Sequence, residues 1–317
     1  MVLNVENLEI TIDRPGRTPV RPVRDVSLSV APGETLALVG ESGCGKSMTC
    51  LALAGLLPRR GRVSAGTITL EGADLGRLSP RQARRLRCKS VASVFQDATG
   101  SLNPVRSVGW QIAETLRLRK GLTRSEAGAE AIKLMGMVGL PDPERRAREF
   151  PHQFSGGMNQ RAMIALAVAG NPRLLIADEA TTALDVTLQA QILDLIGDLR
   201  DRLGMAVLLV THDLGVVAQA ADNAAVMYAG RVVEANTVKA LFAAPRHPYT
   251  RGLMSALPRP DADRERLTTI SGQVPPIDRM PAGCAFAPRC SDASAICTRA
   301  VPALSGSAAC HNLSFGV

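Results

Sequence analysis

The stretch GESGCGKS at residues 40–47 has the residue types and spacing of a phosphate-binding loop. Its glycines let backbone N–H groups turn toward phosphate oxygens, and the positive end of a following helix adds to that attraction. We expect Lys46 to reach the β- and γ-phosphates of a nucleotide, and Ser47 to ligate Mg²⁺. The predicted nucleotide-binding residues are Gly40, Ser42, Gly43, Cys44, Gly45, Lys46, Ser47 and Met48.

Cys44 is the unusual member of this loop. The geometry requires only a small residue there, so we interpret Cys44 as structural. An exposed thiol at this position would make the activity sensitive to alkylation, because an accessible thiolate is a nucleophile.

The stretch LLIADE at residues 174–179 supplies a second chemical element. Asp178 ends an apolar run and can hold Mg²⁺, usually through a water, while Glu179 can polarise an attacking water as general base. An apolar run ending in Asp-Glu is a weak signal alone. Downstream of a phosphate loop at this separation, it predicts nucleotide hydrolysis.

These residues need strands and helices to position them. Apolar runs bounded by polar residues predict buried strands at 35–40, 173–178 and 205–213, and helical spacing predicts helices at 46–57 and 187–203. Strands that alternate with helices favour an α/β domain with a largely parallel sheet. Residues 101–165 have a mostly helical pattern, which indicates an inserted helical subdomain. Residues 225–236 predict a hairpin around Gly230.

Composition limits the class of protein. The 317 residues are 46% hydrophobic and 21% charged, which is a globular balance, and the net charge is +8 (37 basic minus 29 acidic residues). The arginines are spread along the chain without interleaved aromatic residues, so we interpret them first as a solvated surface, next as membrane proximity and last as nucleic-acid binding. No apolar run approaches the ~20 residues that span a bilayer, and the N-terminus lacks a signal-peptide pattern. We expect a soluble, cytoplasmic protein.

FSGGMNQR at residues 154–161 narrows the field. It resembles the signature motif of ABC-transporter ATPases, and physically it is a Ser-Gly-Gly at the start of a helix, a second anion site on one chain. In that family two cassettes pack head-to-tail with two ATP molecules between them. The resemblance therefore implies that Ser155, Gly156 and Gly157 contact the ATP held by a partner cassette.

Three neighbouring motifs occur in the order of the same family. Gln96 in SVFQD looks like the glutamine that senses Mg²⁺ and the membrane subunit, and Asp185 in TTALD looks like the aspartate that crosses the dimer. His212 in LLVTHD looks like the switch histidine that contacts the γ-phosphate. On its position alone, His212 would be interpreted as an ordinary histidine at a strand end. Within this set of motifs, the resemblance favours a catalytic role.

The stretches PHQFSGGM and APRHPYTRGLMSALP resemble the ATPase subunits of dipeptide, oligopeptide and nickel permeases. This resemblance implies ATP hydrolysis that powers uptake of peptides or a related small solute. The implied partners are a second ATPase subunit, more often in a heterodimer, two transmembrane permease subunits and an extracytoplasmic solute-binding protein, with no nucleic acid. The chain would then lie peripherally on the cytoplasmic face of the inner membrane. We expect a nucleotide-binding domain at 1–235 with a helical subdomain at about 97–165, and a small irregular C-terminal domain at 236–317.

The sequence departs from the family pattern at three places. No aromatic residue precedes Phe95, so the usual ring that stacks on adenine is missing, and Arg14, Arg17 or an aliphatic side chain would have to cover the base. Met158 stands where many families carry glutamine, although the peptide-permease group often has methionine. Ala180 follows Glu179 where proline is usual, which predicts a less rigid loop around the general base.

Cys284, Cys290, Cys297 and Cys310 lie in the Pro- and Gly-rich tail without a close C-x₂₋₄-C pair. Disulfides are disfavoured in a reducing cytoplasm, and structural zinc usually shows a close pair. The spacing leaves open a [4Fe–4S] cluster, unconnected structural thiols, or zinc. The resemblance adds one hint, since the tails of some peptide-permease ATPases have been associated with iron–sulfur clusters.

Two other classes of protein share some of these features. A non-transport ABC ATPase of DNA repair or translation would carry every cassette motif, but such proteins usually add long coiled coils, zinc inserts or a second cassette. In a metal- or redox-sensing nucleotide-binding regulator, the tail thiols would be the sensing groups. Neighbouring genes for permeases test the first alternative, and metal-dependent ATPase activity of the chain alone tests the second.

Overall fold

The computed structural model of the chain describes residues 1–95, 98–180, 185–256 and 270–313. These residues form two compact units. The first unit comprises Met1–Leu3, Val30–Glu34 and Leu70–Val210, and the second comprises Asn4–Ser29, Thr35–Thr69 and Thr211–Val317.

The second unit contains the first predicted strand and the predicted hairpin. Strand β3 (Thr35–Val39) pairs in parallel with β9 (Asn223–Tyr228), and β9 pairs antiparallel with β10 (Arg231–Thr237). All five residues of β3 are buried, as expected for a parallel strand that is covered on both faces. Gly230 turns the hairpin with a φ of +85°. The buried strand, its parallel pairing and the hairpin around Gly230 are therefore confirmed.

A second group of strands and several helices complete this unit. The strands lie in the order β2 (Arg17–Val30), β1 (Leu3–Arg14) and β4 (Gly61–Leu70). The helices are α1 (Lys46–Ala54), α9 (Leu214–Ala220), α10 (Val238–Ala243) and α11 (Pro248–Ser255), with 3₁₀ turns η2 (Ala287–Arg289) and η3 (Ala295–Thr298). Helix α1 ends three residues before the predicted Leu57, because Gly55 caps it in the left-handed conformation.

One hydrophobic core joins the tail to the strands of the second unit. It includes Val39 of β3, Val226 and Tyr228 of β9, Tyr249 of α11 and Phe286 beyond it. The C-terminal segment is therefore packed onto the strand that leads into the phosphate loop.

The first unit contains the second predicted strand and the helical insertion. Strands β6 (Val91–Val94), β7 (Leu174–Asp178) and β8 (Ala206–Thr211) run parallel, and β5 (Ala73–Asp74) is short. The helices are α2 (Pro80–Ser90), α3 (Ala98–Ser101), α4 (Val108–Lys120), α5 (Arg124–Met137), α6 (Pro143–Arg146), α7 (Gly156–Val168) and α8 (Val186–Leu203), with the 3₁₀ turn η1 (Pro151–Gln153).

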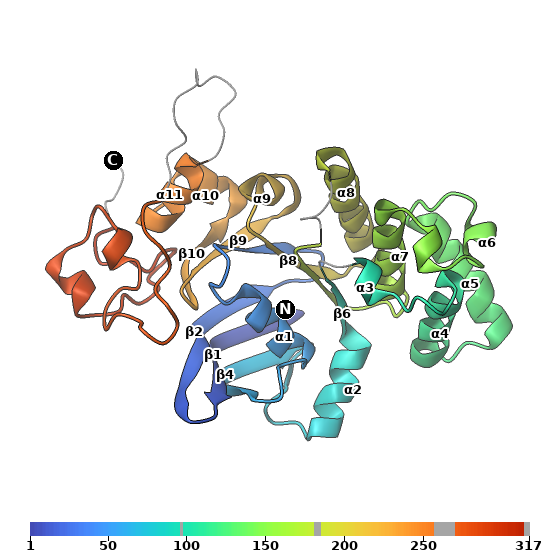
Figure 1. Cartoon of the computed structure of the whole chain (residues 1–317), viewed down its shortest axis with the longest axis horizontal. Coiled ribbons are helices and arrows are strands. Elements are labelled where there is room, and N and C mark those ends of the chain that lie inside the picture. The colour runs from blue at the N-terminus through green and yellow to red at the C-terminus, as the bar shows by residue number, and fades with distance from the viewer. Residues whose placement is uncertain (96–97, 181–184, 257–269, 314–317) are drawn as a thin grey trace, which may run out of the picture. The chain divides into compact units, whose positions relative to one another are not determined.

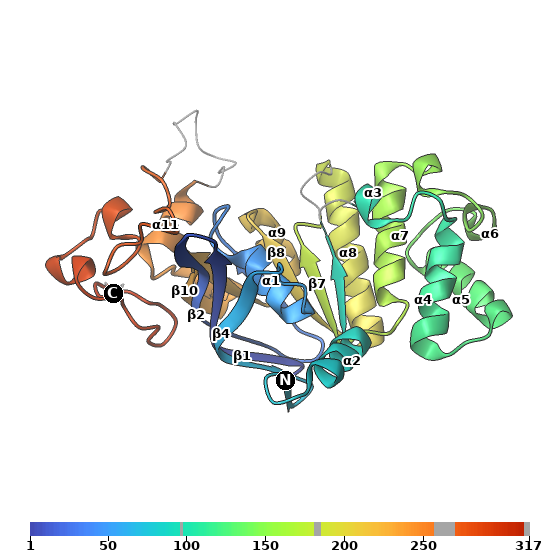
Figure 2. The ribbon, with the colours of Figure 1, turned by 60° about the horizontal axis from the view of Figure 1, so that its bottom comes forward.

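The helical pattern of residues 101–165 is confirmed. Helices α4, α5 and α7 pack against one another, in the green part of Figure 1. Helix α5 begins at a capping box, because the Thr123 hydroxyl accepts from the Glu126 N–H and the Glu126 carboxylate accepts from the Thr123 N–H. Helices α7 and α8 run side by side, as Figure 2 shows. Among the described residues, none of the helices has the length and apolar character needed to cross a bilayer.

Candidate active site

The phosphate loop follows β3 and requires glycine at two positions. Gly40 has a φ of +156°, and a Cβ added there would lie 2.2 Å from the Met227 carbonyl oxygen. Gly45 has a φ of +108°, and its Cβ would lie 2.6 Å from the Pro22 carbonyl oxygen. Both residues also take backbone conformations that favour glycine. The loop can therefore close only with these glycines, as its sequence indicates.

The β9–β10 hairpin is hydrogen-bonded to the phosphate loop. The Gly230 N–H donates to the Cys44 carbonyl at 2.8 Å, and the Arg24 N–H donates to the Gly230 carbonyl at 2.8 Å. The Arg24 guanidinium donates a further bond of 2.6 Å to the Ala229 carbonyl. These bonds fix the part of the loop that an incoming anion would meet.

Lys46 is 5% exposed at the start of α1. Its ammonium donates to the carbonyl oxygens of Gly40 at 2.6 Å and Glu41 at 3.1 Å. The charge is thus held inside the loop by neutral acceptors that a phosphate oxygen can replace, because the ammonium attracts an anionic oxygen more strongly than a neutral one. Ser42, Gly43 and Ser47 are exposed, and Met48 is half-buried.

The side chain of Cys44 is fully buried, with its sulfur 3.7 Å from the Lys46 ammonium nitrogen. Burial raises the pKa of this thiol, so it stays protonated. The structural interpretation of Cys44 fits this position, whereas sensitivity to alkylation would require a thiol that solvent reaches. Only the backbone of Cys44 is placed to bind a phosphate.

His212 directly follows β8 and lies in the second unit, as does the phosphate loop. Its side chain is exposed. The next residue, Asp213, caps α9 by accepting a 2.7 Å bond from the Gly215 N–H. The helix start therefore fixes the backbone beside His212.

The two carboxylates lie at the end of β7 in the first unit. Asp178 is the last residue of the strand, and Glu179 follows with a φ of +50°, an uncommon value for a residue with a side chain. The Glu179 N–H donates to the Val210 carbonyl at 3.0 Å. This backbone bond holds the Glu179 side chain in a direction that ordinary strand geometry would not give.

The side chain of Gln160 binds Ala180, the residue that follows Glu179. Its buried side-chain amide donates to the Ala180 carbonyl, which links α7 to the loop after β7. Sequence reasoning expected a looser loop because alanine replaces proline, and it missed this brace. The sequence feature that could have indicated this bond is the position of Gln160 in FSGGMNQR, one helical turn after the Ser-Gly-Gly.

Removing this brace should slow hydrolysis and spare binding. We expect Gln160→Met to lower kcat for ATP hydrolysis roughly tenfold with little change in KM, because the buried Ala180 carbonyl loses its donor. Steady-state hydrolysis measures both constants. The matched control is Gln191→Met on α8, whose exposed side chain accepts from Arg161. Equal kinetics for the two variants would contradict the role of Gln160.

The signature stretch and Asp185 meet through Leu188 of α8. Ser155 caps α7 by accepting from the Met158 N–H at 3.3 Å, and a Cβ on Gly157 would lie 2.8 Å from a Leu188 methyl carbon. Asp185 caps α8 by accepting from the Leu188 N–H at 2.9 Å. Ser155, Gly156 and Asp185 are exposed. The helix N-terminus that the sequence predicts is present, with Asp185 close by.

Two predicted features lie outside the described residues. Gln96 is one, and residues 181–184 of the TTALD stretch are the other. Of the residues considered to cover adenine, Arg14 donates two 3.0 Å bonds to the Thr18 carbonyl at the β1–β2 turn, and Arg17 is exposed.

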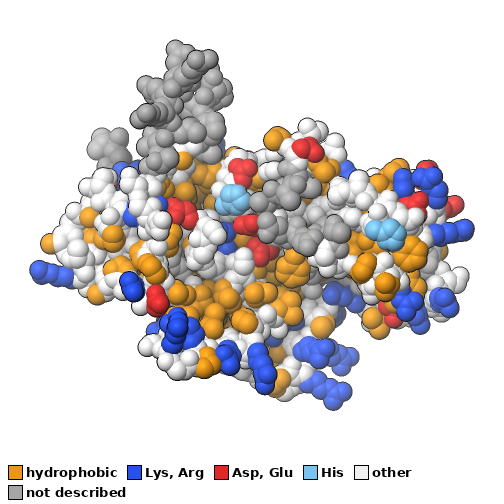
Figure 3. Space-filling model, viewed as in Figure 1, with side chains coloured by type: hydrophobic (Ala, Val, Ile, Leu, Met, Phe, Trp, Pro, Cys, Tyr) orange, Lys and Arg blue, Asp and Glu red, His pale blue; other side chains and the backbone are white. Residues whose placement is uncertain are grey.

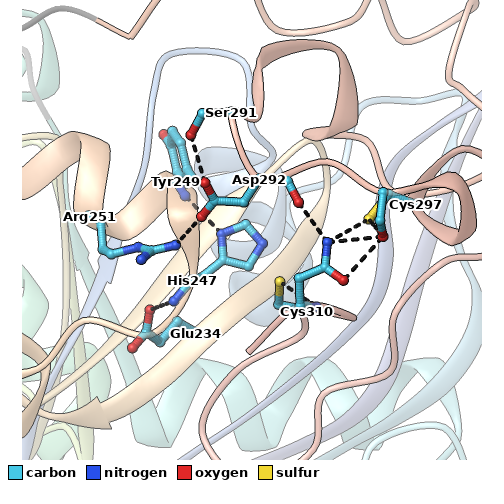
Figure 4. A network of polar contacts seen from close by, with 10 residues as sticks. Glu234, His247, Tyr249, Arg251, Ser291, Asp292, Cys297 and Cys310 are labelled. Atoms are coloured by element: carbon cyan, nitrogen blue, oxygen red, sulfur yellow. Dashed lines mark hydrogen bonds and ion pairs between the residues drawn. The ribbon is translucent and has the colours of Figure 1, made fainter. Parts of the chain in front are cut away.

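The four tail cysteines are free thiols in the second unit. Burial, with the nearby Cys297 and Cys310 thiols, raises the pKa of Cys284. The Asn312 backbone N–H donates to the Cys310 sulfur at 3.4 Å, and its side chain lies 3.8 Å from the Cys297 sulfur (Figure 4). Within the described ranges, however, no three His, Cys, Asp or Glu side chains come together as ligands for a metal ion. This geometry supports neither zinc nor an iron–sulfur cluster.

Two protein-family models match the chain. The model described as ABC transporter matches residues 23–182, and the model described as the C-terminal region of oligopeptide/dipeptide transporters matches residues 233–297. A protein of Brucella abortus (strain 2308), named for peptide import ATP binding, is 49% identical over 304 residues, which cover 96% of this chain and 91% of the relative. A second such protein of the same strain is 50% identical over 315 residues, covering 96% and 93%.

Solved structures agree with these matches. An ATP-binding cassette dimer in a post-hydrolysis state, bound to ADP and Pi, aligns with a TM-score of 0.65 and 26% identity, over 74% of this chain and 98% of that one. The cbiO1 protein of Clostridium perfringens, described as part of an ABC transporter complex, aligns with a TM-score of 0.66 and 26% identity, over 77% and 91%. The α/β cassette fold predicted from the sequence is confirmed.

Proposed function

The chain belongs to the ABC transporter ATPase family, and on that premise we propose that it powers import of peptides, or of a related small solute, through membrane permease subunits. The observation that carries the peptide assignment is the match of residues 233–297 to the oligopeptide/dipeptide transporter tail. The Brucella relatives, named for peptide import over nearly the whole chain, support it. The same matches support a division near residue 235 into a cassette and a tail.

The residues can be given roles in ATP hydrolysis. Backbone N–H groups of the phosphate loop and the Lys46 ammonium would bind the phosphates, Glu179 would take a proton from the attacking water, and His212 would contact the γ-phosphate. Ser47 and Asp178 offer the hydroxyl and carboxylate oxygens that Mg²⁺ prefers, and Gln96 would be a further ligand. A bound Mg²⁺ would neutralise the phosphate charge.

A second cassette would complete the assembly. Ser155 and Gly157 lie at the exposed N-terminus of α7, so an ATP presented by another subunit could reach them. Asp185 would cross the same interface. We propose a heterodimer with a second ATPase subunit, an extracytoplasmic solute-binding protein as the source of the solute, and a peripheral position on the cytoplasmic face of the inner membrane.

Exposed aromatic side chains on the helical part of the first unit support docking of a permease there. Figure 3 shows hydrophobic side chains among lysines and arginines over the region that α4–α7 occupy in Figure 1. Trp110 is 42% exposed beneath the Arg106 guanidinium, and Phe150 is 37% exposed and stacked on His152. Aromatic residues and arginine are enriched in protein interfaces.

Loss of these rings should uncouple the chain from its permeases. We expect Trp110→Ser with Phe150→Ser to lower co-purification with the permease subunits by more than tenfold and to leave ATP binding unchanged, because ring burial contributes most at such sites. The control is Leu118→Ser, an exposed apolar residue at the other end of α4. Full retention of the permeases by the double variant would contradict the proposed surface.

Transport in reconstituted vesicles tests the proposed function. The chain is assembled with its permeases and second ATPase, and uptake of labelled di- and oligopeptides, and of nickel, is measured with the binding protein outside. Hydrolysis that rises with a peptide-loaded binding protein supports the proposal. Hydrolysis that instead responds to DNA ends or ribosomes would assign the chain to a non-transport ABC ATPase.

A further inference from the structure

Glu41 places a negative charge in the phosphate loop itself. It is the second residue of GESGCGKS, and its carbonyl oxygen accepts from the Lys46 ammonium at 3.1 Å. Its carboxylate is only partly exposed. A carboxylate beside bound phosphates repels them unless another charge neutralises it. The loop therefore needs a cation for Glu41 besides Lys46.

Arg289 of the C-terminal segment supplies that cation. Its two terminal nitrogens donate to the two carboxylate oxygens of Glu41, at 3.0 and 3.2 Å, and its side chain is 5% exposed. This is the bidentate pairing in which arginine differs from lysine. The pair joins residues that are 248 positions apart in the sequence.

The Arg289 guanidinium is held from several sides. Its Nε donates to the Ser271 carbonyl at 2.9 Å, and its terminal nitrogens donate to the Ile270 carbonyl at 3.2 Å and the Tyr228 hydroxyl at 3.3 Å. Arg289 ends the η2 turn, directly before Cys290. The charge is thus fixed in place by the tail rather than held by Glu41 alone.

Tyr249 makes a second connection from the tail to the same loop residue. The Glu41 N–H donates to the Tyr249 hydroxyl at 2.9 Å, so this N–H is directed at the tail. Tyr249 is fully buried and packs on the rings of Tyr228 and Phe286, at 4.7 and 5.5 Å between centroids. The direction of the Glu41 backbone is therefore set by α11.

The start of α11 is itself anchored to β10. The Glu234 carboxylate accepts from the Arg246 N–H at 2.8 Å. It also accepts from the His247 N–H at 2.8 Å, and the His247 ring accepts from the Tyr249 N–H at 3.0 Å (Figure 4). These bonds leave Tyr249 little freedom to move. The strand, the helix and the loop residue form one connected set.

We infer that Arg289 and Tyr249 are positioning residues for nucleotide binding: Arg289 neutralises Glu41, and Tyr249 orients the Glu41 backbone in the phosphate loop. This inference rests on the proposed binding of ATP at the loop. It gives the C-terminal segment a direct part in the ATPase site, beyond the family match of the segment.

The two residues should fail in different ways. Arg289→Ala leaves the Glu41 charge unneutralised, so we expect about tenfold weaker ATP binding at low salt and a smaller defect at high salt, where charges are screened. Adding Glu41→Gln to Arg289→Ala removes the repelling charge and should restore most of the binding. Tyr249→Phe removes an uncharged acceptor, so its several-fold loss of ATP binding should not depend on salt.

The test is equilibrium titration of the full chain with ATP and Mg²⁺ at two salt concentrations, with thermal melting as the check on folding. Arg251→Ala is the matched control, because Arg251 pairs with Asp292 of the same tail, at 2.5 Å, whereas Arg289 pairs with a loop residue (Figure 4). It should bind ATP as the wild type does. Arg289→Lys, which keeps the charge but not the bidentate pairing, should lie between wild type and Arg289→Ala.

Rescue separates positioning from folding. If Arg289 only holds the tail together, Glu41→Gln will not restore binding to Arg289→Ala, and this outcome overturns the inference. Wild-type binding by Arg289→Ala also overturns it. If Arg289→Ala does not fold, Glu41→Gln alone decides: unchanged or tighter binding supports the inference, and weaker binding rejects it. The proposed function fails separately, if the wild-type chain shows no binding of ATP in the same titration.

Discussion

Replacing Glu179 with glutamine is expected to leave ATP binding intact and to lower hydrolysis by at least about a hundredfold. Glutamine keeps the shape and hydrogen-bonding reach of the side chain but cannot take a proton from the attacking water, and a general base usually contributes about 10²–10⁴ in rate. The backbone at residue 179 is held by its bond to the Val210 carbonyl and has a φ of +50°. An isosteric change should therefore leave this backbone in place, so the loss of hydrolysis reports the loss of proton transfer.

Single-turnover hydrolysis and ATP titration of the purified variant measure the two effects separately. Glu130→Gln is the control, since Glu130 is a helical glutamate on α5 that pairs with Lys133 at 3.5 Å, apart from the end of β7. Because Ser155 and Gly157 are proposed to close on a partner's ATP, the Glu179→Gln chain mixed with the second ATPase subunit should also accumulate as an ATP-bound dimer. Turnover near the wild-type rate would move the general base to another residue.

The parts predictable from sequence are those where local chemistry leaves one solution. Strand β3 is apolar at four of its five positions and is followed by Gly40, so both its burial and its end can be predicted from the sequence. Gly40 and Gly45 lie where any Cβ would collide with a backbone oxygen, and this requirement is visible in the sequence as the spacing of the two glycines. The strand and the glycine spacing together therefore predict the phosphate loop.

Other elements were missed because their signals are weak or local to a cap. Strand β2 carries two prolines and several arginines, which hides its alternation of buried and exposed residues. The prolines of the tail predict irregular structure, yet Pro248 is the first residue of α11, where proline is favoured, and His247 caps that helix. The same residue type that marks loops here marks a helix start.

Contacts between residues far apart in the chain could not be predicted from the sequence. Arg289 is one arginine among many in the sequence, and only the folded tail shows that its partner is Glu41. Gln160 likewise reaches the Ala180 carbonyl only once α7 is packed against β6, the strand that pairs with β7. The left-handed backbone of Glu179 has no sequence signal either. The site residues follow from motifs, whereas the groups that orient them follow from packing.

Replacing Lys46 with methionine is expected to weaken ATP binding by about a hundredfold or more. The Lys46 ammonium is buried in the loop and donates to the neutral carbonyl oxygens of Gly40 and Glu41, so phosphate oxygens can take the place of these acceptors. Charge-assisted bonds to phosphate are about twice as strong as neutral ones, and removal of the cation would also leave the Glu41 charge less balanced. Methionine fills a similar volume without the charge.

Titration with ATP and with ADP distinguishes the causes of this loss. If Lys46 acts on the β- and γ-phosphates, the defect should be larger for ATP than for ADP, and excess Mg²⁺ should recover only part of it. Lys133→Met, at an exposed position on α5, should bind both nucleotides as the wild type does. An unchanged affinity in Lys46→Met would mean that the backbone N–H groups alone bind the phosphates. Equal losses for both nucleotides, with a lowered melting temperature, would mean that Lys46 chiefly supports the loop.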